Sequence, residues 1–426
     1  MSQLFDSLTV RSSQFHDGIG FHFQLDNRIE NVLKDEDISI FDIEYCAQNT
    51  YLICDESFQC LAAAFLDVKC KYGNALERQF YAGMEVHDLV YRLLTKRPIV
   101  FYLASDSYLL QNLKSGSGGF ERVKETRNGL DNLQSYDEQQ LSALLSMTSS
   151  TIFINDGSRG NCGRKQPYNP LLPLFQRRGV LTGCIGARFE KPNYMEWQHV
   201  MVTEEQNTVP NGYGAVRHSI ANSERLELLR VWATFYGVRY FPTYSEVQEL
   251  RRRDVDTFSD TYIIVPSNSG GPPSYFNKIL YFRRMRLSIA PFLRDANKRV
   301  QLSQYDLLND TYRHRSAHCV AVGLGLGAWL LLPQQVDILL AVYADILSNE
   351  DFPFISDLTF NWFSPDKNCG GSYDGENFSG LGLGKNKHIR IHFNNNNPNQ
   401  VQDEGTLLVV QYAWDSNRYS CSTIVV

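Results

Sequence analysis

The stretch that decides the fold runs from Ala317 to Ser348, AHCVAVGLGLGAWLLLPQQVDILLAVYADILS. Its first part carries no full charge and is rich in small and β-branched residues, which indicates a buried strand. Its second part repeats apolar side chains at helical spacing from Val336 to Leu347, which indicates an amphipathic helix. A buried strand that leads into a helix is typical of α/β proteins.

Glycine occupies alternate positions between this strand and helix, at Gly323, Gly325 and Gly327. Because glycine lacks a Cβ, such a loop can adopt positive φ angles and let a ligand approach the backbone. Amides that converge beside a helix N-terminus bind anions, so a diphosphate is the first ligand we expect. The alternative is tight packing without a ligand. The spacing matches neither a Rossmann fingerprint nor a P-loop.

Composition narrows the class of protein. A chain of 426 residues can hold one large domain with extensions or two to three ordinary domains. The formal charge of −6 argues against a nucleic-acid partner. No apolar run reaches the roughly 20 residues of a membrane span, so we expect no membrane partner either. Nine cysteines without a Cys-x-x-Cys pair, and a start without signal-peptide features, predict a cytosolic protein with free thiols.

The rest of the chain divides into three parts. Residues 1–114 are expected to form a folded N-terminal region, which is a lid, a docking surface for a substrate protein or a structural extension, with a helix at 75–96. Residues 115–147 hold a flexible joint, SGSGG at 115–119, and a leading helix at 137–147. In residues 148–426 we expect strands at 151–154, 180–188, 199–203, 355–362, 389–393 and 407–414, with 180–188 and 199–203 forming a pair. Helices are expected at 224–236, from Thr243 onward and at 276–298. This alternation predicts an α/β sandwich with a mixed sheet.

Polar residues at the ends of these strands are the first candidates for chemistry, since α/β ligand sites lie there. Asn155 and Asp156 end one strand and Asn161 follows in a glycine-broken loop, so their amides could bind a ribose diol. The alternative is that they stabilise their own turns. Asp415 and Asn417 follow the last strand and are either part of a site or residues of a cap or turn.

Acidic residues form the second group of candidates. Glu190 and Glu196 bracket Pro192 in a loop rich in aromatic residues. A carboxylate in an apolar setting has a raised pKa, which suits general acid or base catalysis at a glycosidic bond. The alternative is an ion pair with Arg188 or Lys191. Asp295, at the end of the long helix, is either a further acid or a helix-end residue.

Histidines and cysteines suggest a metal only weakly. His314, His318 and Cys319 stand close together, and His388 and His392 are four residues apart. No HExxH motif accompanies them, so we expect no metal and no cofactor.

Several blocks of sequence occur in an order that resembles a known family. They are FINDGSRGN at 153–161, GCIGARFEKPNYMEWQH at 183–199, TEEQNTVPNGYG at 203–214, RLSIAPFLRDANKRV at 286–300, VGLGLGAW at 322–329, ISDLTFNWF at 355–363 and YAWDSN at 412–417. From about residue 148 onward the chain resembles the macrodomain-like family of ADP-ribose-binding proteins and hydrolases to which the Legionella effector MavL belongs.

The resemblance implies a macrodomain-like three-layer α/β/α fold with a mixed sheet and an N-terminal extension. It implies that ADP-ribose is held by Asn155, Asp156, Gly157, Arg159, Asn161, Gly323, Leu324, Gly325, Leu326, Gly327, Ala328, Trp329 and Asn417. Glu190, Glu196, Asp295 and Asp415 become the candidate catalytic acids.

The function implied is removal of ADP-ribose from a protein side chain, arginine by preference, with ubiquitin as one candidate acceptor. A secreted bacterial effector of this kind would act in the host cytoplasm. The alternative is a non-catalytic module that binds ADP-ribosylated proteins. The Gln-Glu-Glu signature of poly(ADP-ribose) glycohydrolases is absent, and no Glu-x-Glu pair indicates a transferase.

Overall fold

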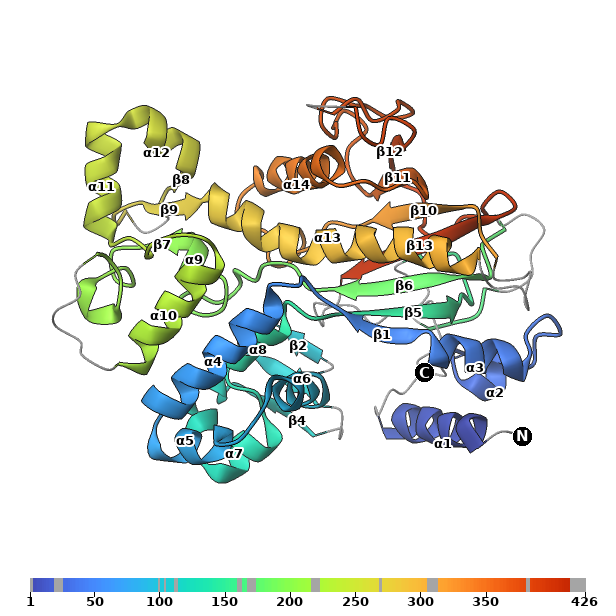
Figure 1. The fold of residues 1–426 in the computed structure, drawn as a ribbon, viewed down its shortest axis with the longest axis horizontal. Coiled ribbons are helices and arrows are strands. Elements are labelled where there is room, and N and C mark those ends of the chain that lie inside the picture. The colour runs from blue at the N-terminus through green and yellow to red at the C-terminus, as the bar shows by residue number, and fades with distance from the viewer. Residues whose placement is uncertain are drawn as a thin grey trace.

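A seven-stranded mixed sheet organises the chain, in the order β1-β5-β6-β13-β10-β11-β12 (Figure 1). Its strands are β1 (Thr50–Ile53), β5 (Ser146–Ile152), β6 (Arg178–Cys184), β10 (Ser316–Ala321), β11 (Ile355–Asn361), β12 (Arg390–Asn394) and β13 (Thr406–Ala413). The strands from β6 to β12 in that order are parallel, whereas β5 is antiparallel to β6 and β1 is antiparallel to β5. The predicted α/β class and mixed sheet are confirmed.

The structure is a computed structural model that describes residues 3–18, 26–98, 100–102, 105–110, 114–158, 163–166, 174–215, 223–267, 270–304, 313–380 and 384–413. Arg159, Asn161, Asp415 and Asn417 lie outside these ranges, so the roles expected for them stay predictions. No helix in the described ranges is long and apolar enough to cross a membrane.

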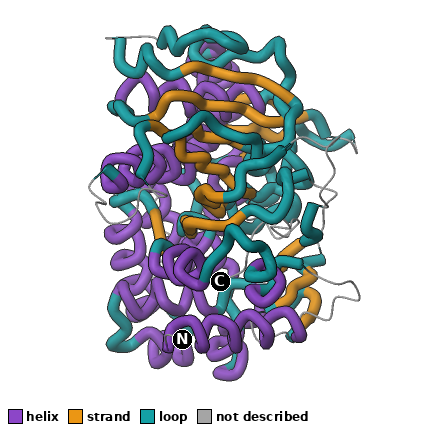
Figure 2. The backbone as a smooth tube through the Cα atoms, turned by 90° about the vertical axis from the view of Figure 1, so that its right-hand side faces the viewer, coloured by secondary structure: helices purple, strands orange, loops and turns teal. Residues whose placement is uncertain are grey.

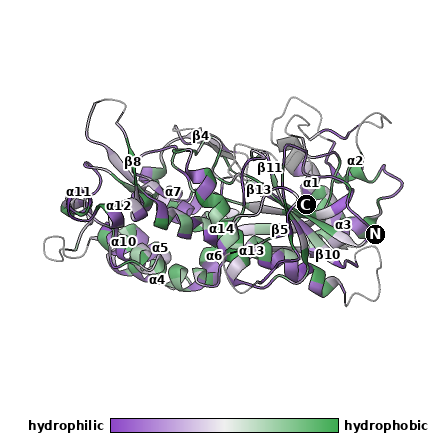
Figure 3. Ribbon diagram, turned by 90° about the horizontal axis from the view of Figure 1, so that it is seen from above, coloured by the Kyte–Doolittle hydropathy of each residue, from purple (hydrophilic) through white to green (hydrophobic). Residues whose placement is uncertain are grey.

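The two faces of the sheet are covered differently. The helices α13 (Lys278–Ser303) and α14 (Gln335–Asn349) pack on the face that carries Cys319 and Val409. The opposite face presents the alternate residues Val320 and Val410, which pack against Phe153 and Phe175. Helices therefore lie mainly on one side of the strands and loops mainly on the other (Figure 2), with hydrophobic residues along the strands between them (Figure 3).

The N-terminal third is joined to this sheet. Its β1 is an edge strand, and α1 (Gln3–Gly18), α2 (Ile29–Val32) and α3 (Ile40–Gln48) pack on Ile152 and Ile154 at the end of β5. The division at residues 114 and 148 stays a prediction, as does the specifically macrodomain-like layering.

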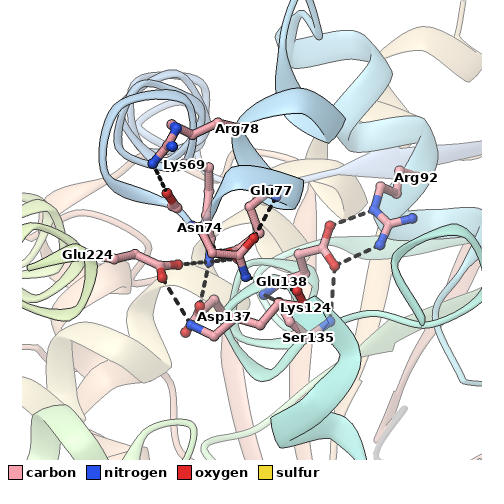
Figure 4. Close-up of polar contacts among 11 residues, drawn as sticks. Lys69, Asn74, Glu77, Arg78, Arg92, Lys124, Ser135, Asp137, Glu138 and Glu224 are labelled. Carbon is pink, nitrogen blue, oxygen red and sulfur yellow. Dashed lines mark hydrogen bonds and ion pairs between the residues drawn. The ribbon is translucent and has the colours of Figure 1, made fainter. Parts of the chain in front are cut away.

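A group of short helices lies beside the sheet. It consists of α4 (Phe58–Tyr72), α5 (Ala75–Tyr81), α6 (Val86–Thr95), η1 (Phe120–Glu125), α7 (Arg127–Asn132) and α8 (Tyr136–Ser142), with the small sheet β2 (Val100–Tyr102), β3 (Ser107–Leu109) and β4 (Ser115–Ser117). The helix α10 (Glu224–Phe235) packs against α4. The fully buried Lys69 of α4 ties the group together, because it forms ion pairs with Glu77, Asp137 and Glu224 from three other helices (Figure 4).

A smaller lobe completes the fold. It contains α9 (Trp197–Val200), η2 (Val209–Asn211), α11 (Tyr244–Arg253) and α12 (Val255–Thr261), with the sheet β7 (Met201–Val202), β9 (Ser274–Asn277) and β8 (Tyr262–Val265). The capping box expected at Thr243 and Glu246 begins α11, since each side chain bonds the backbone of the other.

Several predicted elements were wrong in detail. The expected joint at 115–119 contains β4, which pairs with β3. The helix expected at 75–96 is two helices separated at Gly83, where φ is +77°. The strand at 199–203 pairs with β9 and not with the strand at 180–188. The first and third errors reflect strand pairing that overrides a local propensity. The second reflects a local break at Gly83, after which the capping box of Glu85 and Asp88 begins a new helix.

Candidate functional site

The carboxyl ends of the parallel strands β6, β13 and β10 lie at one edge of the sheet, the usual place for a ligand in an α/β protein. The loop after β6 contains Glu190 and Glu196, and the loop after β10 contains Gly323 to Trp329. The strand β13 lies between β6 and β10, and the chain that follows it leads to Asp415. The structure thus brings two of the predicted segments, the Glu190 loop and the glycine loop, to one edge.

The two described loops interlock through their glycines. A Cβ on Gly186 would lie 2.5 Å from Gly325 N and 2.7 Å from Leu324 C. Gly325 has a φ of +68°, and a Cβ on it would lie 3.0 Å from Ala187 O. Tight packing therefore explains the glycine at position 325. This is the alternative to ligand binding that the sequence left open for the motif.

Gly327 is different, because a Cβ placed on it would meet nothing within 4 Å. Gly327 is also exposed, so the space on the Cβ side of its backbone is unfilled. The helix α14 begins only at Gln335, so the glycine loop does not lead directly into a helix N-terminus as the sequence suggested. An anion at this loop would depend on the loop's own amides rather than on the helix dipole.

Glu190 is the acid that reaches the glycine loop. Trp329 Nε1 donates a hydrogen bond to Glu190 Oε2 over 3.3 Å, and an Arg188 guanidinium nitrogen lies 3.4 Å from the same oxygen. Arg188 is itself held by a 2.9 Å ion pair with Asp106 from the N-terminal third. The Glu190 side chain keeps 13% of its surface exposed, so it is positioned by both loops and still accessible.

Glu196 is buried in an ion pair that stabilises the loop. Its side chain is 1% exposed, Oε1 accepts from Arg284 Nε at 2.7 Å and Oε2 accepts from the Arg188 amide at 3.0 Å. Arg284 also donates to the carbonyl oxygens of Ile185 and Gly186. The pair therefore fixes the start of the loop that carries Glu190, and neither charged group faces a ligand.

Asp295 also lies in the interior. It accepts hydrogen bonds from Tyr51 Oη and Thr148 Oγ1, each at 2.7 Å, and from Arg299 Nε at 2.9 Å. These partners join α13 to β1 and β5. Burial is the first cause, and the neighbouring Asp295 carboxylate a further cause, of a raised pKa at Tyr51. A carboxylate with three internal donors has a structural explanation without catalysis.

The segment Asn155–Gly157 lies at the opposite edge of the sheet, because β5 runs antiparallel to β6. A strand of this length spans about 20 Å, so the segment and the glycine loop do not line one cleft here. Asn155 is fully buried, donates to Arg164 O and accepts from the Gly157 amide, while Asp156 accepts from Asn397 Nδ2 at 2.8 Å. These bonds fit the alternative reading, in which the side chains stabilise their own turn.

Sequence reasoning missed several residues that build the site. Gly186 and Arg284 hold the first loop, as described above. Gln411 holds the second: its Oε1 accepts from the Val322 amide at 3.3 Å, directly before the glycines, and from Tyr343 Oη at 3.0 Å. A glutamine in an apolar strand was the available signal for the last of these, since a buried amide needs partners.

Two of the histidines considered as metal ligands, His318 and His392, form hydrogen bonds within and beside the sheet. His318 lies between Gln402 and Thr359, and His392 bonds Asp357 at 2.9 Å. Among the residues that the structure describes, no three His, Cys, Asp or Glu side chains are grouped so that they could hold a metal ion. The seven described cysteines are all free thiols.

A partly exposed carboxylate beside an open glycine loop, at the carboxyl edge of an α/β sheet, is suited to an enzyme that acts on a phosphorylated ligand. The chain belongs to the family of MavL-like ADP-ribosylhydrolases, which it matches over residues 11–422. The resemblance noted in the sequence is therefore confirmed, and with it an enzyme family of ADP-ribosylhydrolases.

Two relatives from Drosophila melanogaster are similar over most of the chain. ADP-ribosylarginine hydrolase CG2909 is 32% identical over 363 residues, which are 83% of this chain and 66% of the relative. ADP-ribosylarginine hydrolase CG3568 is 33% identical over 379 residues, 87% of this chain and 69% of the relative. The chain thus spans about two thirds of the length of these relatives.

Proposed function

We propose that this protein is an ADP-ribosyl hydrolase that releases ADP-ribose from arginine side chains, on a macrodomain-like fold. The names of its family and of its two relatives support the reaction class and the arginine linkage. The observation that carries the proposal is the Glu190 carboxylate, held beside the glycine loop by Trp329. ADP-ribosylated ubiquitin is a suitable first protein substrate to test.

The chemistry assigned to Glu190 is general base catalysis. Its carboxylate accepts a proton from water as the water oxygen bonds to the ribose C1″ and the bond from C1″ to the arginine nitrogen breaks. The departing guanidine takes up a proton from solvent. The carboxylate also stabilises positive charge that develops at C1″, and the open amides at Gly327 would hold the diphosphate. General base catalysis contributes about 10²–10⁴ in rate.

A non-catalytic binding module is the alternative that the sequence left open. No feature of the described site favours it, whereas the family name and an accessible acid favour hydrolysis. Asp415, two residues beyond the end of β13 in the sequence, remains a second candidate acid.

Two glutamine substitutions test the assignment. Glu190→Gln should lower the rate of ADP-ribose release from an arginine-ADP-ribosylated protein by about 10²–10⁴ and leave the thermal midpoint unchanged. Glu196→Gln is the matched variant. It should cost about 3–5 kcal/mol of stability, because it leaves the buried Arg284 without its counter-ion. A Glu190→Gln enzyme with the wild-type rate would remove Glu190 from the mechanism.

A further inference from the structure

Asp106, in the turn before β3 of the N-terminal third, bonds both of the cations that flank Glu190 in the sequence. The Asp106 side chain is fully buried. Its Oδ1 accepts from an Arg188 guanidinium nitrogen at 2.9 Å, and its Oδ2 forms an ion pair with Lys191 Nζ. Tyr136 Oη also donates to Oδ2. A carboxylate of the N-terminal third is thus joined to the loop of the proposed catalytic base.

The backbone fixes Asp106 in this position. Its φ of +54° is left-handed, a conformation that Asp and Asn adopt more readily than most residues with a side chain. The Gly118 amide donates to Asp106 O at 3.1 Å, and β4 pairs with β3 directly after the turn. The small sheet therefore holds the acid in place, and an asparagine at position 106 suits the same backbone.

The Arg188 guanidinium is shared unequally between two carboxylates. One of its nitrogens lies 2.9 Å from Asp106 Oδ1 and 3.4 Å from Glu190 Oε2. Only the shorter contact has the length of a strong charge-assisted hydrogen bond. Asp106 therefore keeps Arg188 from forming a full ion pair with Glu190.

Lys191 is also bound away from Glu190. Besides Asp106, its ammonium bonds Glu121 Oε1 at 2.9 Å and Tyr136 Oη at 2.6 Å. Burial lowers the pKa of Lys191, but hydrogen bonds to Asp106 and Glu121 more than offset this effect, so that its pKa is raised. Among the ion pairs of the described residues, Lys191 has none with Glu190.

The other neighbours of Glu190 bring no further cation to it. Glu196, in the same loop, is buried in its pair with Arg284 of α13, and Trp329 supplies a neutral donor from the glycine loop. In the described part of the chain, Arg188 thus forms the one ion pair of Glu190. A cation close to a carboxylate stabilises the ionised form and weakens the carboxylate as a base. The strength of the base therefore depends on how closely Arg188 binds it.

We propose that Asp106 is a positioning residue for the proposed hydrolase reaction: by binding Arg188, it leaves the Glu190 carboxylate able to accept a proton from water. The inference rests on the proposed function of Glu190. Asp106 touches no reacting atom in this scheme and acts through Arg188 alone. The N-terminal third thereby contributes to catalysis.

The test is the pH dependence of kcat for ADP-ribose release by the full chain. In Asp106→Asn, Arg188 loses its nearer carboxylate and turns to Glu190. The acid limb of the profile should then move to lower pH by about 1 unit, the lower limit for a carboxylate that gains an arginine partner. The plateau rate should fall about tenfold, a part of what a general base contributes. The thermal midpoint of each variant checks that it is folded.

Two comparisons distinguish positioning from a general loss of charge. Glu121→Gln removes a carboxylate from Lys191 but leaves the Asp106–Arg188 pair intact, so its acid limb should stay in place. In an Arg188→Gln background, Asp106→Asn should move the limb no further, because the cation through which Asp106 acts is gone. This background leaves no buried guanidinium without a counter-ion, so it provides the test even if Asp106→Asn alone does not fold.

Glu190→Gln separates this inference from the proposed function. If Glu190→Gln retains the acid limb, Glu190 is not the base and the assignment under the proposed function fails. If Glu190→Gln removes the limb but Asp106→Asn lowers the rate without moving it, Asp106 is only structural and this inference alone is overturned. An equal shift in Glu121→Gln, or a further shift in the Arg188→Gln background, would overturn it as well.

Discussion

Gly186→Ala should separate the two loops of the candidate active site. The added Cβ would lie 2.5 Å from Gly325 N, 2.7 Å from Leu324 C and 2.8 Å from Gly325 Cα. All three are backbone atoms, so no side-chain rotation can relieve the contact. Because non-bonded carbon atoms prefer about 3.5–4.0 Å, the loops would have to move apart by about 1 Å.

The magnitude follows from that displacement. Overpacking of this kind costs about 1–3 kcal/mol of stability. The Trp329–Glu190 hydrogen bond, 3.3 Å long, would pass beyond hydrogen-bonding distance if the loops separated. Since a 1 Å misplacement of a catalytic group can cost about 100-fold in rate, we expect a loss of activity greater than the loss of stability alone explains.

Urea unfolding and ADP-ribose release, both measured on the same preparation, check this expectation. Gly327→Ala is the matched control for stability: its Cβ would meet nothing within 4 Å, so its unfolding free energy should stay within about 0.5 kcal/mol of wild type. The reasoning is refuted if Gly186→Ala unfolds and turns over like the wild type, since the two loops could then separate without cost.

Three further predictions address binding, pH and stability. Gly327→Trp should abolish calorimetric ADP-ribose binding without changing the thermal midpoint, because the bulky ring fills open space at the loop. His199 is buried, and it is protonated below about pH 6.5 in the unfolded chain but only below about pH 3 in the folded protein. Its contribution to the free energy of unfolding is therefore complete above pH 6.5 and falls as the pH drops through this window. At pH 5 the loss is about 2 kcal/mol, and His199→Phe should remove it from urea titrations; an unchanged pH slope would contradict the burial argument. Lys69→Met should cost about 3–5 kcal/mol in the same assay, since it leaves three carboxylates without their buried cation.

Local patterns were sufficient for much of the fold. The apolar alternation of β10 and the helical spacing of α14 are properties of neighbouring residues, and both elements formed where expected. The capping box at Thr243 is equally local. The flexible joint expected at 115–119 was wrong. A glycine- and serine-rich segment is flexible only when it has no strand to pair with, and here residues 115–117 pair with β3.

The direction of a strand is a different kind of property. The Asn155 segment ends a strand as Gly323 does, and the sequence gives no sign that β5 runs against β6. A ligand site at the carboxyl edge requires parallel strands. Two segments with equally suggestive residues therefore lie at opposite edges, and only long-range pairing distinguishes them.

The same limit applies to the two glutamates, which stand six residues apart in one aromatic loop. Both are carboxylates in apolar surroundings, so any local argument gives them the same role. What separates them is Arg284, 88 positions away on α13, which forms a buried pair with Glu196. With Glu196 neutralised in the interior, the loop can hold Glu190 at the surface against Trp329. The proposed catalytic base and its structural neighbour are thus distinguished by one distant arginine, and Arg284→Met should consequently lower activity through the loop as well as lower stability.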